Sequence, residues 1–529
     1  MQVQHITEHF NPRRSPCVFA VFLFAATLIL TGVREIAAVE TRRKLPSPGS
    51  IIGDYVKARG GKKRCAAIRD ATYEWTAAGE VRARVQKRAP VSLRTDETSP
   101  GGETNNAASA RSAWTRGADG NLRTLTDAES LGAKLTAAIV ASNLVEWKKL
   151  NLLARTVGVE AGETESAYVV EFSTREGAKA RATFGAGSKL LLKLSDPWRA
   201  REIVFADYKL KDGVLEPHRM SISERGAAPT IYQLQSAQYN TNLAETIFDP
   251  PSEVAINIPD LLREVARNQK ELDERVSEYT FTRKETEREI NDRGELKRER
   301  VKVQEIYPVR GGGRVLKLIS ENGVALSPER TAKEEKRVAE ELEKAERDYR
   351  KEQEKRERNA AEKIKRKGNE TGVGKDGDDE FEGVSTFLRA CEFVSPRREV
   401  FRERAAIVFD FRARPGFRPQ NSGESLVSKL IGVVWIDPED KQVMRLEARL
   451  ADGFKIGGGL LASVRSGSAF AFEQTRMADG VWLPRMAQIN ASVKVLLLAG
   501  LRLDATREYS DYKKFNTQTG DAKLNEVKQ

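Results

Sequence analysis

Apolar and polar residues alternate with a period of two over two long stretches of the chain. The alternation runs through residues 180–184, is interrupted by the turn 185–188, and resumes over residues 190–194. It recurs around the turn 437–440, with residues 444–450 on the far side. A period of two on both sides of a turn is typical of half-buried antiparallel strands. We therefore predict a mainly β chain.

The two stretches lie in halves that resemble each other in sequence. Asp212-Gly-Val-Leu-Glu-Pro217 in the first half recurs as Asp479-Gly-Val-Trp-Leu-Pro484 in the second, and an Arg-Met pair closely follows each copy. The Asp-Gly dipeptide supplies the positive φ angles of a tight hairpin turn. We interpret the chain as a tandem duplication with domains at residues 50–251 and 259–516.

A few helices punctuate the predicted strands. We expect helices over residues 51–68 and 259–276, and another over 126–149, where Thr126 and Glu129 have capping-box spacing. In the second half, 27 of the residues 329–367 are charged, 15 basic and 12 acidic. This composition predicts a charged helical arm at residues 329–380, ending in a Gly/Asp linker. Both a solvated projection and a partner-binding helix fit the arm.

The N-terminus has the pattern of an export signal. Arg13 and Arg14 precede the apolar run 18–30, and the small pair Ala37-Ala38 follows. The run is shorter than the roughly 20 residues of a membrane span. We predict that residues 1–38 are a signal peptide, with an uncleaved anchor in the inner membrane as the alternative, and that the protein is periplasmic.

Composition removes several classes of function. Among 529 residues, 40% are hydrophobic and 31% charged, which excludes a polytopic membrane protein. The three His and three Cys leave little material for metal or nucleophilic chemistry. After removal of residues 1–38 only His218, Cys65 and Cys391 remain, so we predict no metal site and no cofactor. The two cysteines can pair or stay as buried thiols.

The net charge and the short motifs add no catalytic function. The charge of +12 is compatible with nucleic acid or anionic lipid, but the export signal argues against nucleic acid and leaves contact with a membrane surface open. Residues 372–377 satisfy GxGxxG, yet they follow a charged helix instead of a strand. His218 has no GxSxG partner motif. We predict that the chain is not an enzyme.

Large apolar residues on the strand faces are the remaining candidates. Their default role is the core, but a curved antiparallel sheet closed by helices can enclose an apolar cavity for acyl chains. These residues are Phe184, Leu192, Phe205, Trp435, Phe472 and Trp482. All of them except Phe472 are candidate ligand-binding residues.

Residues 50–251 resemble the outer-membrane lipoprotein-sorting proteins, relatives of the periplasmic lipoprotein carrier. The resemblance rests on residues 51–61, on the hairpin 184–194, on residues 207–217 and on the closing segment 239–250. The second half is similar to companion domains of the same envelope group. The resemblance implies an α+β fold of two incomplete antiparallel β-barrels, each with lid helices over an apolar cavity.

The function that follows from this resemblance is binding without catalysis. We expect a periplasmic carrier for a lipid, a lipoprotein acyl chain or another apolar ligand, with an envelope protein as a further partner at the charged arm. The alternative is an envelope scaffold or stress-sensing protein whose barrels are filled by their own side chains. A hydrolase that uses His218 is the third hypothesis.

Overall fold

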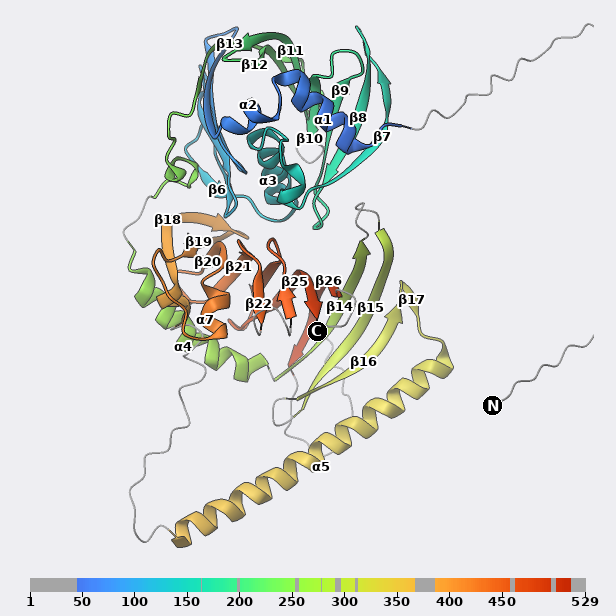
Figure 1. Cartoon of the computed structure of the whole chain (residues 1–529). Helices are drawn as coiled ribbons and strands as arrows, with labels where there is room; N and C mark the ends of the chain where they lie inside the picture. The colour runs from blue at the N-terminus through green and yellow to red at the C-terminus, as the bar shows by residue number, and fades with distance from the viewer. Residues whose placement is uncertain are drawn as a thin grey trace, which may run out of the picture. The chain divides into compact units, whose positions relative to one another are not determined.

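The computed structural model describes ten stretches of the chain. These are residues 45–162, 164–196, 200–252, 256–276, 278–290, 296–309, 313–366, 386–456, 462–495 and 501–514. They form two large antiparallel sheets with few helices (Figure 1), and neither sheet closes into a complete barrel. The predicted mainly β fold with incomplete barrels is confirmed.

The first sheet contains 13 strands among the described residues, all within the first predicted domain. They are β1 (Asp70–Ala77), β2 (Val81–Arg88), β3 (Ser92–Ser99), β4 (Gly102–Ala108), β5 (Ala113–Arg116), β6 (Leu122–Thr124), β7 (Leu153–Ala161), β8 (Ser166–Ser173), β9 (Lys179–Gly185), β10 (Leu191–Asp196), β11 (Arg201–Lys211), β12 (Val214–Glu224) and β13 (Thr230–Tyr239). Their order is β6-β5-β4-β3-β2-β1-β13-β12-β11-β10-β9-β8-β7. The first and last strands therefore pair in the middle, and the predicted hairpin 180–194 is β9–β10.

Three helices lie against the concave side of this sheet (Figure 1): α1 (Pro48–Arg59), α2 (Lys62–Ala67) and α3 (Asp127–Ala141). The Ser47 side chain caps α1 by accepting a hydrogen bond from the Ser50 backbone amide, and Pro48 occupies the first turn. The single helix predicted over 51–68 is instead two, because Gly60 and Gly61 have φ of 146° and 89°. These angles suit glycine and end α1 after Arg59.

Helix α3 is shorter than the 126–149 prediction. Thr126 is its N-cap residue but makes no side-chain capping bond, so the predicted capping box is wrong. The Glu129 carboxylate pairs with Arg123 instead. At the other end Asn143 and Leu144 have positive φ, which turns the chain out of the helix. A 3₁₀ turn, η1 (Trp147–Leu150), follows after the break.

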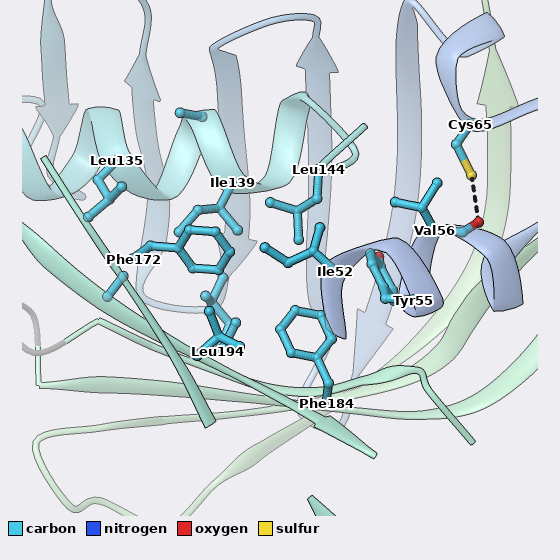
Figure 2. Packing of buried hydrophobic residues seen from close by; sticks show 14 of the residues in the cluster. Ile52, Tyr55, Val56, Cys65, Leu135, Ile139, Leu144, Phe172, Phe184 and Leu194 are labelled. Carbon is cyan, nitrogen blue, oxygen red and sulfur yellow. Dashed lines mark hydrogen bonds between the residues drawn. The ribbon is translucent and has the colours of Figure 1, made fainter. Parts of the chain in front are cut away.

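The helices bury their apolar faces on the strands (Figure 2). Leu135 and Ile139 of α3 and Ile52 of α1 pack over Phe172 and Phe184 of β8 and β9. The Tyr55 ring lies 5.3 Å from that of Phe184, centroid to centroid. Burial of one such side chain stabilises the fold by roughly 1.5–3 kcal/mol.

The second sheet contains the remaining strands, within the second predicted domain. They are β14 (Tyr279–Ile290), β15 (Leu296–Val309), β16 (Gly313–Glu321), β17 (Val324–Ala325), β18 (Cys391–Phe401), β19 (Arg404–Ala413), β20 (Leu430–Ile436), β21 (Val443–Leu450), β22 (Phe454–Ile456), β23 (Ala462–Val464), β24 (Ala469–Arg476), β25 (Trp482–Val495) and β26 (Leu501–Lys514). The main path is β17-β16-β15-β14-β26-β25-β24-β21-β20-β19-β18, with β22 paired to β23 and β23 to β25. Here too the first and last strands pair, through β14 and β26. The tandem duplication remains an interpretation.

Helices also pack against the second sheet. Helix α4 (Ile258–Val276) matches the prediction over 259–276, and its Leu261 and Leu262 pack with Phe409 and Phe411 of β19. The short helix α7 (Ser422–Val427) is capped by the Asn421 side chain. The helix α4 therefore covers one face of the sheet, as the predicted lid does.

The charged arm is the helix α5 (Pro328–Arg366), inserted between β17 and β18. Its first turns are docked on β16, because Val338 is buried and the Glu334 carboxylate accepts a hydrogen bond from the Leu318 backbone amide. Lys317 pairs with Glu335 at 3.3 Å. The arm is therefore anchored at its start, whereas the predicted Gly/Asp linker of residues 368–380 lies outside the described residues.

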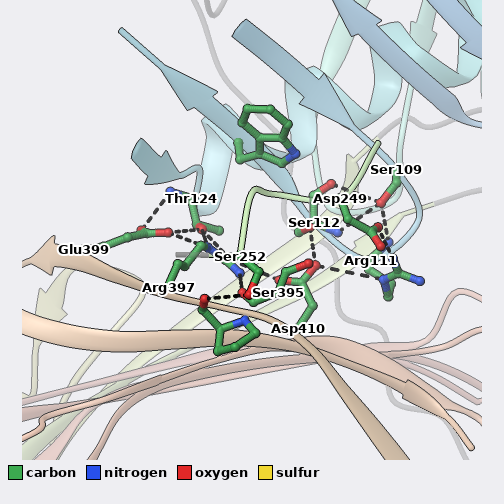
Figure 3. Close-up of polar contacts among 12 residues, drawn as sticks. Ser109, Arg111, Ser112, Thr124, Asp249, Ser252, Ser395, Arg397, Glu399 and Asp410 are labelled. Atoms are coloured by element: carbon green, nitrogen blue, oxygen red, sulfur yellow. Dashed lines mark hydrogen bonds and ion pairs between the residues drawn. The ribbon is translucent and has the colours of Figure 1, made fainter. Parts of the chain in front are cut away.

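Buried polar side chains join the two halves (Figure 3). The Arg397 guanidinium of β18 donates to Thr124 Oγ1 of β6 at 2.6 Å and pairs with Glu399 at 2.7 Å. The Ser112 hydroxyl donates to the carboxylate of Asp410 at 2.5 Å. A buried charge that loses its partner is strongly destabilising. The strands that carry these side chains must therefore keep the positions in which the pairs form.

The N-terminal predictions are not tested by the fold. Residues 1–38 lie outside the described residues, as does the GxGxxG match at 372–377. No helix in the part of the chain that the structure describes has the length and apolar character that crossing a membrane requires.

Candidate ligand-binding site

A cavity of about 220 Å³ lies between the first sheet and the helices α1 and α3. Its lining is mainly apolar and includes Trp75, Val85, Trp114, Ile139, Leu194, Phe205 and Ile222. For comparison, an engineered apolar cavity of about 150 Å³ stays dry and binds benzene. The cavity is therefore large enough for an apolar group.

The strand register shows that the cavity extends along β2. Ala83, Val85 and Lys87 occupy alternate positions of β2, and all three line the cavity. Ala83 pairs with Glu97 of β3, and Lys87 pairs with Leu93. Four residues of strand span roughly 13 Å, so the Lys87 and Glu97 levels are separated by about that distance.

A buried polar cluster borders the cavity at the Lys87 level. The Arg59 guanidinium pairs with Glu216 at 2.7 Å and donates to Asn143 Oδ1 at 2.9 Å. Lys87 Nζ donates to the same Asn143 oxygen at 2.7 Å. The hydroxyls of Tyr73 and Tyr239 donate to Glu216 Oε1 at 3.0 and 2.8 Å. The cluster thus ties α1, β1, β2, β12 and β13 together.

The left-handed turn after α3 places Asn143 at the centre of this cluster. The Asn143 amide nitrogen donates to the Cys65 carbonyl at 3.2 Å, while its oxygen faces the two cations. Asn adopts positive φ more readily than most residues, which suits it to this turn. The early end of α3 is therefore the local feature that builds the site.

Burial and neighbouring charges shift the protonation of the cluster. Burial, and then the Arg59 guanidinium, lower the pKa of Lys87 to about 7. Burial alone would raise the pKa of Glu216, but Arg59, Lys87 and the two tyrosine hydroxyls lower it overall. Glu216 is therefore an anion at neutral pH, and Lys87 is poised between its charged and neutral forms.

The arrangement combines an apolar chamber with a polar border formed by Arg59, Lys87 and Glu216, which matches a molecule with an apolar body and a polar end. His218 is half-buried, and its Nδ1 lies 3.1 Å from the Glu216 carbonyl oxygen. No group of three or more His, Cys, Asp or Glu side chains among the described residues is placed to hold a metal ion.

A second cavity, of about 210 Å³, has a more charged lining drawn from both halves. Arg445 is one of its residues, and it pairs with Asp127 at 2.6 Å and with Glu473 at 2.5 Å. Lys134 and Arg449 also line it. Because its charges are concentrated along the wall, it suits an apolar ligand less well than the first cavity does.

The predicted ligand-binding residues do not lie together. Phe205 lines the first cavity. Phe184 is fully buried in the core, and Leu192 is half-buried and is not part of the cavity lining. Trp435 and Trp482 belong to one core cluster of the second half, and Trp482 Nε1 donates to Asp440 at 2.8 Å. Phe472 is half-buried on β24.

The polar residues of the site were not among the sequence candidates. The sequence pattern that could reveal them is a charged residue at a position that faces inward. Lys87 is such a residue, because it lies on the same face of its strand as Ala83 and Val85. Glu216 likewise lies between Val214 and Met220 on the inward face of β12. Alternation alone identifies such residues as unusual, but it does not show that they meet.

Cys65 and Cys391 are free thiols in the structure, each almost fully buried. Burial raises the pKa of both, for Cys391 to about 12. Since the thiolate is the reactive form, we expect neither to react with a maleimide at neutral pH in the native protein, and both to react in denaturant. Mass spectrometry of a variant with Cys17→Ser checks this, and rapid native labelling would contradict it.

Comparisons with known proteins found similar solved structures of low sequence identity. A putative outer membrane lipoprotein-sorting protein domain from Vibrio parahaemolyticus is 13% identical, with 37% of this chain and 97% of that chain covered and a TM-score of 0.26. A LolA superfamily protein from Nitrosomonas europaea is 12% identical, with 39% and 98% covered and a TM-score of 0.27. A MucA/MucB complex structure from Pseudomonas aeruginosa is 8% identical, with 87% and 94% covered and a TM-score of 0.17. No family model and no curated protein matches the chain.

The names of the first two structures are those of the group that residues 50–251 resemble in sequence. Because the TM-scores are low, these likenesses carry no argument about what the chain binds.

Proposed function

We propose that the first half of the chain is a binding domain for the apolar chain of a lipid, a lipoprotein or another amphiphile. The observation that carries this proposal is the cavity of about 220 Å³ with a mainly apolar lining. Removing one CH₂ group from water into such a lining is worth roughly 0.8 kcal/mol, so a short alkyl chain supplies several kcal/mol of binding free energy.

The proposed setting is the periplasm, with the chain acting as a carrier or sensor and not as a catalyst. The export pattern of residues 1–38 supports this location. The polar groups beside the cavity are bonded to one another around Glu216 and Asn143, an arrangement that suits the polar end of a ligand.

A carboxylate inside the cavity is expected to abolish binding of a fluorescent fatty acyl probe. Phe205 lines the cavity, whereas its neighbour Val204 is 40% exposed on the outer side of β11. Phe205→Glu should weaken probe binding at least about 50-fold, because an ionised group is strongly disfavoured in an apolar site. Val204→Glu is the matched control and should bind like the wild type. Fluorescence titration measures both affinities.

Organic extracts of the purified protein provide a second measurement. Mass spectrometry of protein prepared without detergent should detect stoichiometric lipid in the wild type and in Val204→Glu, and none in Phe205→Glu. Equal probe affinity in the two variants, with both folded by circular dichroism, would contradict the proposed function.

The second candidate is a scaffold that binds another envelope protein. The helix α5 favours it, because most described positions after its docked start are exposed and carry charges of both signs. Such a helix can present a polar docking face to a partner. A wild-type protein with no extractable lipid and no saturable probe binding would favour this candidate.

A further inference from the structure

The Lys87 ammonium group borders the cavity and has more N–H donors than its hydrogen bond to Asn143 uses. The side chain is 5% exposed and belongs to the cavity lining. An ammonium group has three N–H donors, and one of them is used by Asn143 Oδ1 at 2.7 Å. The Tyr73 ring centroid lies 5.4 Å from Nζ and contributes a weak cation–π contact. Lys87 can therefore bind another acceptor.

The charges around Lys87 do not balance. Arg59 and Lys87 are the two cations of the cluster, and Glu216 is its carboxylate. Glu216 Oε1 already accepts hydrogen bonds from Arg59, Tyr73 and Tyr239. With Lys87 protonated, one positive charge is left without a counterion in an apolar enclosure, which is costly.

The other carboxylate of the cavity wall is too far away to compensate. Glu97 lies at the level of Ala83, about 13 Å along the strand from Lys87. The Tyr232 hydroxyl donates to its Oε2 at 2.8 Å. An anionic ligand would supply the counterion that the described cavity wall does not place beside Lys87.

We propose that the cavity binds an amphiphile with a monoanionic head, such as the carboxylate of a fatty acid, with the head on Lys87 and the chain directed along β2 toward Ala83. This inference rests on the proposed function and adds the chemistry of the head group. The chain would lie between α3 and the inward residues of β11, which include Ile203 and Phe205.

The proposal predicts a dependence on pH. Several groups face Lys87 or couple to its charge: Arg59 of α1, Cys65 of α2, Tyr73 of β1, Asn143 after α3 and Glu216 of β12. Burial and the neighbouring Arg59 guanidinium lower the pKa of Lys87 to about 7. An anion binds the protonated form, so its affinity should fall as pH rises above 7, whereas a neutral head should be indifferent to this titration.

Calorimetric titration with decanoate and decan-1-ol tests the inference, because the two ligands share their chain length and differ in head group. At about pH 6 we expect decanoate to bind about 10- to 100-fold more tightly than decan-1-ol. At about pH 9, where the carboxylate is still ionised, this ratio should fall toward one. Lys87→Met should have a ratio near one at both pH values.

Arg82→Met is the matched control, since Arg82 is exposed on the same strand. It should keep the wild-type ratio. Equal affinities of the two ligands for the wild type at about pH 6 would overturn the inference and leave the proposed function intact, whereas absence of binding of both would overturn the two together. If Lys87→Met does not fold, the pH series on the wild type decides.

Discussion

Replacing Arg397 by Ala is expected to lower the free energy of unfolding by about 3–5 kcal/mol. The Arg397 side chain is fully buried, and its guanidinium pairs with Glu399 at 2.7 Å and with Asp410 at 3.0 Å. It also donates to Thr124 Oγ1 and to the Ser395 carbonyl. Its removal leaves two buried carboxylates without their main counterion. Urea denaturation measures the loss.

The neighbouring residue provides the control for this prediction. Arg398 is exposed on the same strand, and Arg398→Ala should change stability by no more than about 0.5 kcal/mol. Replacing Arg397, Glu399 and Asp410 together by Met, Leu and Leu should restore part of the stability, because no buried charge is then left unpaired, although the Thr124 amide and the Ser112 hydroxyl lose their carboxylate acceptors. A similar loss of unfolding free energy for Arg397→Ala and Arg398→Ala would contradict the stabilising role assigned to the buried ion pairs of Arg397.

The second large effect is expected at Gly432 in β20. A Cβ atom at this position would lie 1.9 Å from the backbone oxygen of Glu447 and 2.7 Å from Cζ of Phe411. The oxygen belongs to the paired strand β21 and cannot move without disturbing the ladder. Gly432→Ala should therefore cost about 3 kcal/mol or more, measured by urea denaturation.

Gly158 in β7 is the matched control because it is also a strand glycine. A Cβ atom there would meet no atom within 4 Å. Gly158→Ala should leave stability unchanged or raise it by up to about 1 kcal/mol, since alanine restricts the unfolded chain more than glycine does. Equal tolerance of the two substitutions would show that β20 and β21 are not packed as closely as described.

Local pattern was sufficient to predict much of the fold. The hairpin 180–194, the strand pair around the turn 437–440 and the helix over 259–276 all have side chains whose spacing matches the element that forms. The errors were at helix ends. Gly60 and Gly61 divide one predicted helix into two, and the turn at Asn143 shortens another, because a left-handed residue terminates a helix that apolar spacing alone would extend.

The candidate site was less accessible to sequence reasoning. The predicted residues were large and apolar, and Phe205 is the one of the five that lines the cavity. Trp435 is instead buried in the core of the second half. An inward apolar residue packs against other side chains or borders an empty space according to what the opposite elements supply, and this information is not local.

The sequence by itself determined the strand content and the charged helix α5, because both depend on residues close together in the chain. Tertiary structure alone decided that Arg59, Lys87, Asn143 and Glu216, from α1, β2, the turn after α3 and β12, form one buried cluster. It also decided that a cavity remains beside them. Packing of side chains distant in sequence sets both features, and alternation along one strand does not contain that information.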